Sequence, residues 1–181
     1  MVYVFLADGF EEIEALTPVD VLRRAGIETK TVGVTGKTVT GSHGISVNCD
    51  IEISNADTKD LDAVILPGGL PGADYLDKSE KVHAFLSFAE ENGLIIAAIC
   101  AAPAILGRHG MLDGKNAVCF TGFEGELKGA NVMREKAVRD GNIITACGAG
   151  AAFEFAFLIL NALTGDDQSA DNMSRAMKYT I

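Results

Sequence analysis

The sequence predicts an α/β sandwich whose central sheet is mostly parallel. The apolar runs at residues 2–7, 62–66 and 94–99 show no alternation, which is typical of strands buried on both faces of a parallel sheet. Segments with apolar residues at helical spacing separate these runs, and glycines mark the junctions. Strands that alternate with helices in this way favour one sheet covered by helices.

Length, charge and composition limit the class of protein. The chain has 181 residues, 48% of them hydrophobic, and a formal net charge of −10, so we expect one domain over residues 1–181. The acidic balance argues against nucleic acid or an anionic membrane as a partner, since both attract basic surfaces. The sequence shows no signal-peptide pattern, no membrane-spanning apolar stretch and no Cys-x-x-Cys pair. We therefore expect a cytoplasmic protein with reduced thiols and no zinc site.

The first third of the chain is predicted to hold two strands, a helix and a hairpin. Residues 2–7 form the first strand, and residues 27–34 alternate as the second. Between them, apolar residues at helical spacing predict a helix that breaks or restarts at Pro18 and ends at Gly26. Residues 38–53 contain two glycines around Ser42 and His43, which predicts a hairpin with an irregular tip.

The remaining elements alternate in the same way. The predicted strands are 62–66, 94–99 and 115–120, followed by a hairpin at 136–146. The predicted helices begin at Ser79 and Pro103, and two more cover 151–163, which is strongly apolar, and 166–179, which is polar. A loop rich in glycine and proline, 67–72, follows the strand 62–66. Open α/β sheets bind ligands at such carboxyl ends of strands.

Cys100 falls where the buried strand 94–99 turns sharply into the helix that begins at Pro103. A side chain at this junction stands above the strand's carboxyl end, beside free backbone N–H groups and the positive end of the helix dipole. These features are expected to lower the thiol pKa from about 8.5. Free cysteines are more often buried and inert, which fits the other three, but the strand–turn–helix position of Cys100 favours a reactive thiol.

A reactive thiol needs a group that receives its proton. His83 and His109 are expected to be solvated or to satisfy a local hydrogen bond, since neither lies at a strand's carboxyl end. Glu14 follows the first strand between apolar neighbours, so we expect partial desolvation, a raised pKa and a hydrogen bond to the sulfur. Glu11 and Glu12 are expected to be ordinary first-turn charges.

Five motifs occur in order: Glu11-Glu12-Ile13-Glu14, Pro18 to Gly26, Leu66-Pro67-Gly68-Gly69, Ala98 to Pro103, and Phe153-Glu154-Phe155-Ala156. Together the motifs resemble the ThiJ/PfpI superfamily, most closely the branch that contains the parkinsonism-associated protein deglycase. The resemblance covers nearly the whole chain and implies a flavodoxin-like three-layer sandwich. It implies that Cys100 is the nucleophile, that Glu14 is its protonated partner, and that the backbone N–H groups of Gly69 and Ala101 are oxyanion donors.

The resemblance also implies a homodimer with the pocket near the interface. Gly68 and Phe120 are expected to line this pocket. Arg24 and the hairpin tip around His43 match positions that approach this pocket at the dimer interface.

The chain departs from the superfamily pattern at several positions. Protease-like relatives carry a histidine directly after the cysteine, where this chain has Ala101, so peptidase activity is not expected. Phe120 stands where the deglycase branch often has a histidine, and His43 where its best-known member has an arginine. Cys147 and Ala149 replace an arginine and a proline before the last buried helix.

Two functions are compatible with this resemblance. In the first, the protein is a glyoxalase III or protein deglycase that acts on small 2-oxoaldehydes such as methylglyoxal, with Cys100 as nucleophile and Glu14 as proton shuttle. That reaction needs no metal or cofactor, and we expect none. In the second, the protein is a redox-sensing stress-response protein or chaperone in which Cys100 oxidises to sulfinate. Cys119 or Cys147 could then resolve a sulfenate as a disulfide.

Overall fold

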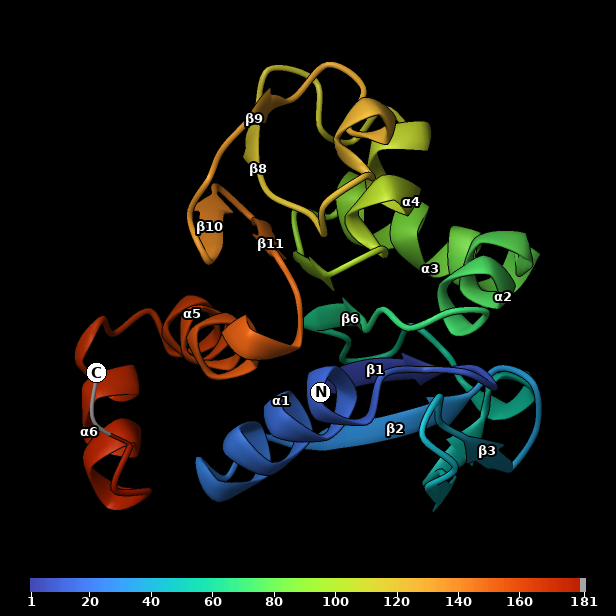
Figure 1. Ribbon diagram of the computed structural model, residues 1–181. Helices are drawn as coiled ribbons and strands as arrows, with labels where there is room; N and C mark the ends of the chain where they lie inside the picture. Colours follow the sequence, from blue (N-terminus) through green and yellow to red (C-terminus); the bar gives the residue numbers. More distant parts are fainter. Residues whose placement is uncertain (180–181) are drawn as a thin grey trace.

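A seven-stranded sheet forms the middle layer of the protein, which the computed structural model describes over residues 1–179 (Figure 1). The strand order is β10-β11-β7-β6-β1-β2-β5, and each pairing is parallel except that of β10 with β11. The strands are β1 (Val2–Leu6), β2 (Thr29–Gly33), β5 (Ile51–Glu52), β6 (Ala63–Leu66), β7 (Ile95–Ile99), β10 (Ala137–Asp140) and β11 (Ile143–Ala146). The predicted α/β fold with a mostly parallel sheet is confirmed.

Helices cover both faces of this sheet (Figure 1). One face carries α1 (Glu12–Arg24) and α5 (Ala152–Thr164), with α6 (Gln168–Ala176) beside α5; the other carries α2 (Gly72–Lys78), α3 (Glu80–Glu91) and α4 (Pro103–Arg108). Successive residues of β1 belong to opposite cores, Val4 to the core under α1 and Phe5 to the core under α3. Both faces of the strand are therefore apolar, which explains the lack of alternation. No helix within residues 1–179 is long and apolar enough to span a lipid bilayer.

Short elements complete the fold. β3 (Thr38–Thr40) and β4 (Ser46–Asn48) form the predicted antiparallel hairpin, whose tip contains His43. β8 (Asn116–Ala117) and β9 (Asn131–Val132) form a separate parallel pair. Single-turn helices occur at η1 (Ile53–Asn55), η2 (Glu124–Glu126) and η3 (Ala149–Ala151).

The prediction of a helix break at Pro18 is wrong, because α1 runs through this residue. Pro18 lacks the N–H that would bond to the carbonyl group one turn earlier. The helix is continuous nevertheless, since Pro18, Val19 and Leu22 are buried and α1 packs along α5. Burial of this face outweighs one missing hydrogen bond.

The strand predicted at 115–120 is also largely wrong, since only β8 forms there, outside the central sheet. Side chains, in place of a neighbouring strand, accept hydrogen bonds from the backbone of this segment. The Asn116 N–H donates to Asp140, and the Val118 N–H donates to the Thr145 hydroxyl. Helix α2 was not predicted. It begins directly after a glycine- and proline-rich loop, where such composition is typical of turns.

Candidate active site

Cys100 lies in the turn between β7 and α4, which is the predicted strand–turn–helix position. Its φ angle of 66° is in the left-handed region, which costs a non-glycine residue on the order of 1 kcal/mol. Two hydrogen bonds hold this conformation: the Cys100 N–H donates to the Ala146 carbonyl (2.9 Å), and the Cys100 carbonyl accepts from the Phe120 N–H (2.8 Å). The strained turn presents the thiol above the carboxyl end of the sheet.

Glu14 extends from α1 to the same place. It is 1% exposed, its Oε2 accepts a hydrogen bond from the Gly68 N–H at 2.9 Å, and its carboxyl group hydrogen-bonds the Cys100 thiol. The loop after β6 lies beside Cys100 because β6 and β7 are neighbouring parallel strands. The absence of a side chain at Gly68 makes this approach possible, since a Cβ atom there would lie 2.6 Å from the Cys100 Cβ and 2.7 Å from Glu14 Oε2.

Burial controls the protonation of both groups. It raises the pKa of Glu14 to about 7, although hydrogen bonds from Cys100 and the Gly68 backbone oppose the shift. Burial and then the charge of Glu14 raise the pKa of the Cys100 thiol to about 12, against hydrogen bonds from the backbone N–H groups of Ala101 and Gly69. The raised pKa of Glu14 agrees with the prediction. The lowered pKa predicted for Cys100 is wrong, because burial and the adjacent carboxylate outweigh the N–H donors.

The raised pKa of Glu14 makes stability depend on pH. Glu14 titrates at about 7 in the folded protein and near its ordinary value of 4.5 when unfolded, so its stabilising contribution is complete below pH 4.5 and is lost as the pH rises through 7. Relative to a Glu14→Gln variant, we expect the free energy of unfolding to fall by about 3 kcal/mol across this interval. Urea unfolding of both proteins at pH 4.5 and pH 8 measures the difference. Parallel pH profiles would contradict the assignment.

Phe120 lies at the rim of the Cys100 site and is half exposed. A Cβ atom at Gly148 would lie 3.2 Å from the Phe120 ring and 3.9 Å from Glu14 Oε1. The ring is therefore near the carboxyl group but cannot exchange a proton with it. Glu14 is the titratable side chain that hydrogen-bonds the thiol.

His43 and Arg24 each contact a carboxylate group of α1. The His43 Nδ1 and backbone N–H contact the Glu12 carboxylate at 2.9 and 2.8 Å. Arg24 is at the far end of α1, about 15 Å from Glu14 along the helix axis, and pairs with Asp20 at 2.7 Å. The predicted approach of Arg24 and His43 to a pocket at a dimer interface depends on a second subunit and stays a prediction.

Glu12 is more than the ordinary first-turn charge that we expected. It is 6% exposed, and a Cβ atom at Gly41 would lie 2.3 Å from its Oε1. Burial alone would raise the pKa of Glu12, but hydrogen bonds from the His43 side chain and from the backbone of His43 and Ile45 lower it to about 2. Glu12 thus fixes the hairpin tip to α1. The glycines that flank Ser42 and His43 were the signal for such a close approach.

The sequence is similar to one family over most of its length, since residues 1–162 match the model of the DJ-1/PfpI family. The chain is 38% identical over 168 residues to Protein dj-1beta of Drosophila melanogaster, covering 91% of this chain and 90% of that protein. It is also 38% identical over 172 residues to the Parkinson disease protein 7 homolog of Danio rerio, covering 92% and 91%.

Solved structures show the same similarity. Toxoplasma gondii DJ-1 superposes with a TM-score of 0.94 at 33% identity, over 99% of this chain and 98% of that one. A DJ-1 superfamily protein from Salmonella typhimurium gives a TM-score of 0.93 at 34% identity, again over 99% and 98%. Sequence and fold agree with the resemblance found in the motifs, and the chain belongs to the DJ-1/PfpI family.

Proposed function

We propose that this protein is a cysteine-dependent enzyme of the glyoxalase III or protein deglycase type that acts on small 2-oxoaldehydes or their adducts. The observation that carries the proposal is the hydrogen bond between the Cys100 thiol and the buried Glu14 carboxyl group, beside two backbone N–H donors. A nucleophile, a base within hydrogen-bond reach and an oxyanion site are the parts that carbonyl addition requires.

Glu14 activates the thiol as a general base. Its pKa of about 7 makes part of the carboxyl group available as carboxylate at neutral pH, where a general base is most effective. As Sγ of Cys100 bonds to the aldehyde carbon of methylglyoxal, the thiol proton passes to Glu14. A free thiolate is not needed, so the raised pKa of Cys100 is compatible with this step.

The backbone N–H groups of Gly69 and Ala101 stabilise the oxyanion that forms on the aldehyde oxygen. Both groups hydrogen-bond the Cys100 sulfur, so they flank the carbon atom that becomes bonded to it. Glu14 returns the thiol proton to the oxyanion, which completes the hemithioacetal. Its carboxylate then takes the C1 proton and delivers it to C2, while the proton of the C1 hydroxyl moves to the C2 oxygen, which gives a lactoyl thioester. Water hydrolyses the thioester to lactate and restores the thiol. The overall conversion is methylglyoxal plus water to lactate, with C1 oxidised and C2 reduced.

Lactate formation from methylglyoxal tests the proposal. We expect Glu14→Gln to lower kcat/KM by about 10²- to 10³-fold, because an amide of the same shape cannot accept the thiol proton. Asp20→Asn removes an exposed carboxylate from the same helix and serves as the matched control, with activity retained. Absence of lactate with the unmodified protein, or unchanged turnover in Glu14→Gln, would contradict the proposal.

Redox sensing is the second candidate, because the Cys100 side chain is only partly buried and the solved structure of Toxoplasma gondii DJ-1 is of the oxidized protein. Peroxide would convert the thiol to sulfenic and then sulfinic acid, and protonated Glu14 would donate a hydrogen bond to the product. All four cysteines are free, which fits the cytoplasm we expect. Mass spectrometry after mild peroxide should find two added oxygens on Cys100; a disulfide to Cys119 or Cys147 would indicate resolution, and equal oxidation of every thiol would contradict sensing.

The homodimer expected from the resemblance has a candidate surface on α1 and the β3–β4 hairpin. Ile13 and Ile45 are each 54% exposed. With Phe153 and Met177 they line an apolar groove of about 400 Å³. A second copy of the chain would remove this apolar surface from water. Light scattering that gives the mass of one chain at micromolar concentration would contradict the dimer.

A further inference from the structure

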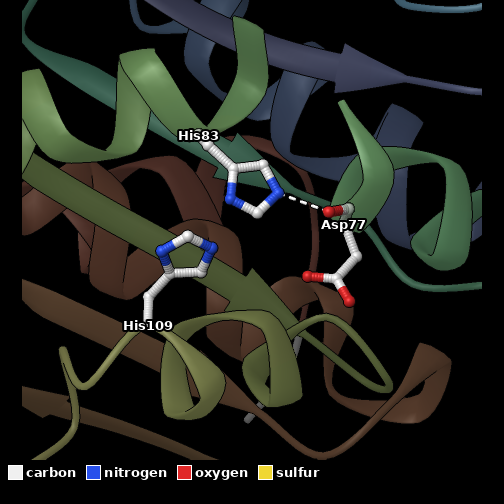
Figure 2. Close-up of side chains that lie close together, drawn as sticks. All are labelled: Asp77, His83 and His109. Atoms are coloured by element: carbon white, nitrogen blue, oxygen red, sulfur yellow. Dashed lines mark hydrogen bonds between the residues drawn. The ribbon is translucent and has the colours of Figure 1, made fainter. Parts of the chain in front are cut away.

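Asp77, His83 and His109 form a cluster on the α2–α4 side of the sheet (Figure 2). Asp77 lies in the last turn of α2, His83 in the first turn of α3, and His109 directly follows α4. One ligand atom from each residue lies within 4.8 Å of the others, and the two imidazole rings are 4.2 Å apart between centroids. No pattern in the sequence indicated that these two histidines meet.

His83 is oriented as a metal ligand. Its Nε2 is within hydrogen-bonding distance of the Asp77 backbone carbonyl, an acceptor, so Nε2 carries the proton and donates it. The second nitrogen, Nδ1, is thereby left with its lone pair, and it lies on the side of the ring that faces His109 (Figure 2). A hydrogen bond from one ring nitrogen to a backbone carbonyl is the usual arrangement around an imidazole that binds metal through the other.

Asp77 is held in place by a neighbouring cation. The Arg108 Nη2 lies 2.8 Å from Asp77 Oδ2, and Nη1 of the same guanidinium contacts Glu126 at 3.3 Å. One oxygen of the Asp77 carboxylate points toward the two rings (Figure 2). Arg108 therefore orients this carboxylate without occupying both of its oxygens.

We propose that Asp77, His83 and His109 bind a divalent first-row transition-metal ion, with Zn²⁺ as the probe. Two imidazoles and one carboxylate suit Zn²⁺ and its neighbours, and the fourth position is left to water. Tetrahedral ligands at about 2.0–2.2 Å from Zn²⁺ lie roughly 3.4 Å apart, so binding needs side-chain shifts on the order of 1 Å. All three residues are only partly buried, which leaves the ion a route from solvent.

The second cluster of possible ligands, Glu11, Glu12 and His43, is a weaker candidate. There the His43 Nδ1 already contacts the Glu12 carboxylate at 2.9 Å, so this contact must break before Nδ1 can bind a metal ion. The two clusters therefore give opposite expectations, and His43 provides the control for the first.

Metal binding at the first cluster would connect two segments that leave the candidate active site. α2 follows the loop that contains Gly69, and α4 follows Cys100. The cluster joins the far ends of these two helices. Zn²⁺ should therefore raise the unfolding temperature of the full chain, because an ion bound only by the folded state stabilises it. The binding does not depend on Cys100 chemistry.

Zn²⁺ titration of the chelator-treated full chain tests the proposal, with Cys100→Ser included so that this thiol does not compete for the ion. We expect one Zn²⁺ per chain and a higher unfolding temperature. His83→Gln and His109→Gln should each weaken binding about 100-fold, and Arg108→Gln, which removes only an orienting contact, about 10-fold. His43→Gln should bind as the parent does.

Co²⁺ provides a second readout, because ligand-field bands of nitrogen and oxygen ligands differ from thiolate charge-transfer bands. If a histidine variant fails to fold, Asp77→Asn, checked by circular dichroism, takes its place with the same expected loss. Zn²⁺ affinity that is equal in the parent and the cluster variants would overturn the proposal. So would a loss confined to His43→Gln, or a thiolate spectrum.

Discussion

Cys100→Ser is expected to lower kcat/KM for lactate formation from methylglyoxal by about 10⁴-fold or more. A serine hydroxyl is a weak nucleophile, and Glu14, with a pKa of about 7, is too weak a base to deprotonate it. The oxyanion donors of Gly69 and Ala101 would remain, so a small residual rate is expected rather than none. The measurement is lactate release under saturating substrate and at low substrate, which separates kcat from KM.

Cys49→Ala supplies the matched control. Cys49 is also a free thiol, but it is 1% exposed and belongs to the core under α1. Its removal tests whether loss of any thiol lowers activity through stability alone. Near-normal turnover in Cys100→Ser, with the fold verified by circular dichroism, would mean that another group is the nucleophile. That result would refute the assignment of Cys100.

The sequence was sufficient for the architecture because the central strands carry an unambiguous pattern. Strands β1, β6 and β7 are apolar on both faces, and only a sheet covered on both sides buries such residues. The continuity of α1 through Pro18 was not predictable, since it depends on packing against α5. The length of β8 was not predictable either, because the side chains of Asp140 and Thr145 satisfy its backbone.

The candidate site was predictable in position and less so in electrostatics. The pattern around Cys100 indicates a turn above the sheet, and Glu14 follows β1, whose carboxyl end lies at the same edge of the parallel sheet as that of β7, so both could be placed from the chain. The direction in which the pKa of the Cys100 thiol shifts could not be predicted, because it depends on how deeply the completed fold buries the sulfur beside a carboxylate. The proximity of His83 and His109 could not be predicted for the same reason, because the two rings meet only when α3 and the end of α4 pack together.

Gly68→Ala is expected to reduce both stability and turnover, because the new methyl group has no free space. Its Cβ would lie 2.6 Å from the Cys100 Cβ, 2.7 Å from Glu14 Oε2 and 3.0 Å from the Ile99 carbonyl. Ile99 ends β7 and Cys100 follows it directly, so the structure must shift as a whole. Overpacking of this kind destabilises by about 1–3 kcal/mol. A displacement near 1 Å between nucleophile and base lowers turnover by about 10²-fold.

Gly150→Ala distinguishes the effect of position from the effect of the substitution. A Cβ atom at Gly150 meets nothing within 4 Å, and this glycine lies in η3, in the segment between β11 and α5. We therefore expect Gly150→Ala to leave the unfolding temperature and kcat/KM close to the parent values. If Gly68→Ala behaved in the same way, Cys100 and Glu14 could move apart without loss of activity. Their contact would then not be the basis of catalysis, and the proposed role of Glu14 would fail even if Cys100 proved essential.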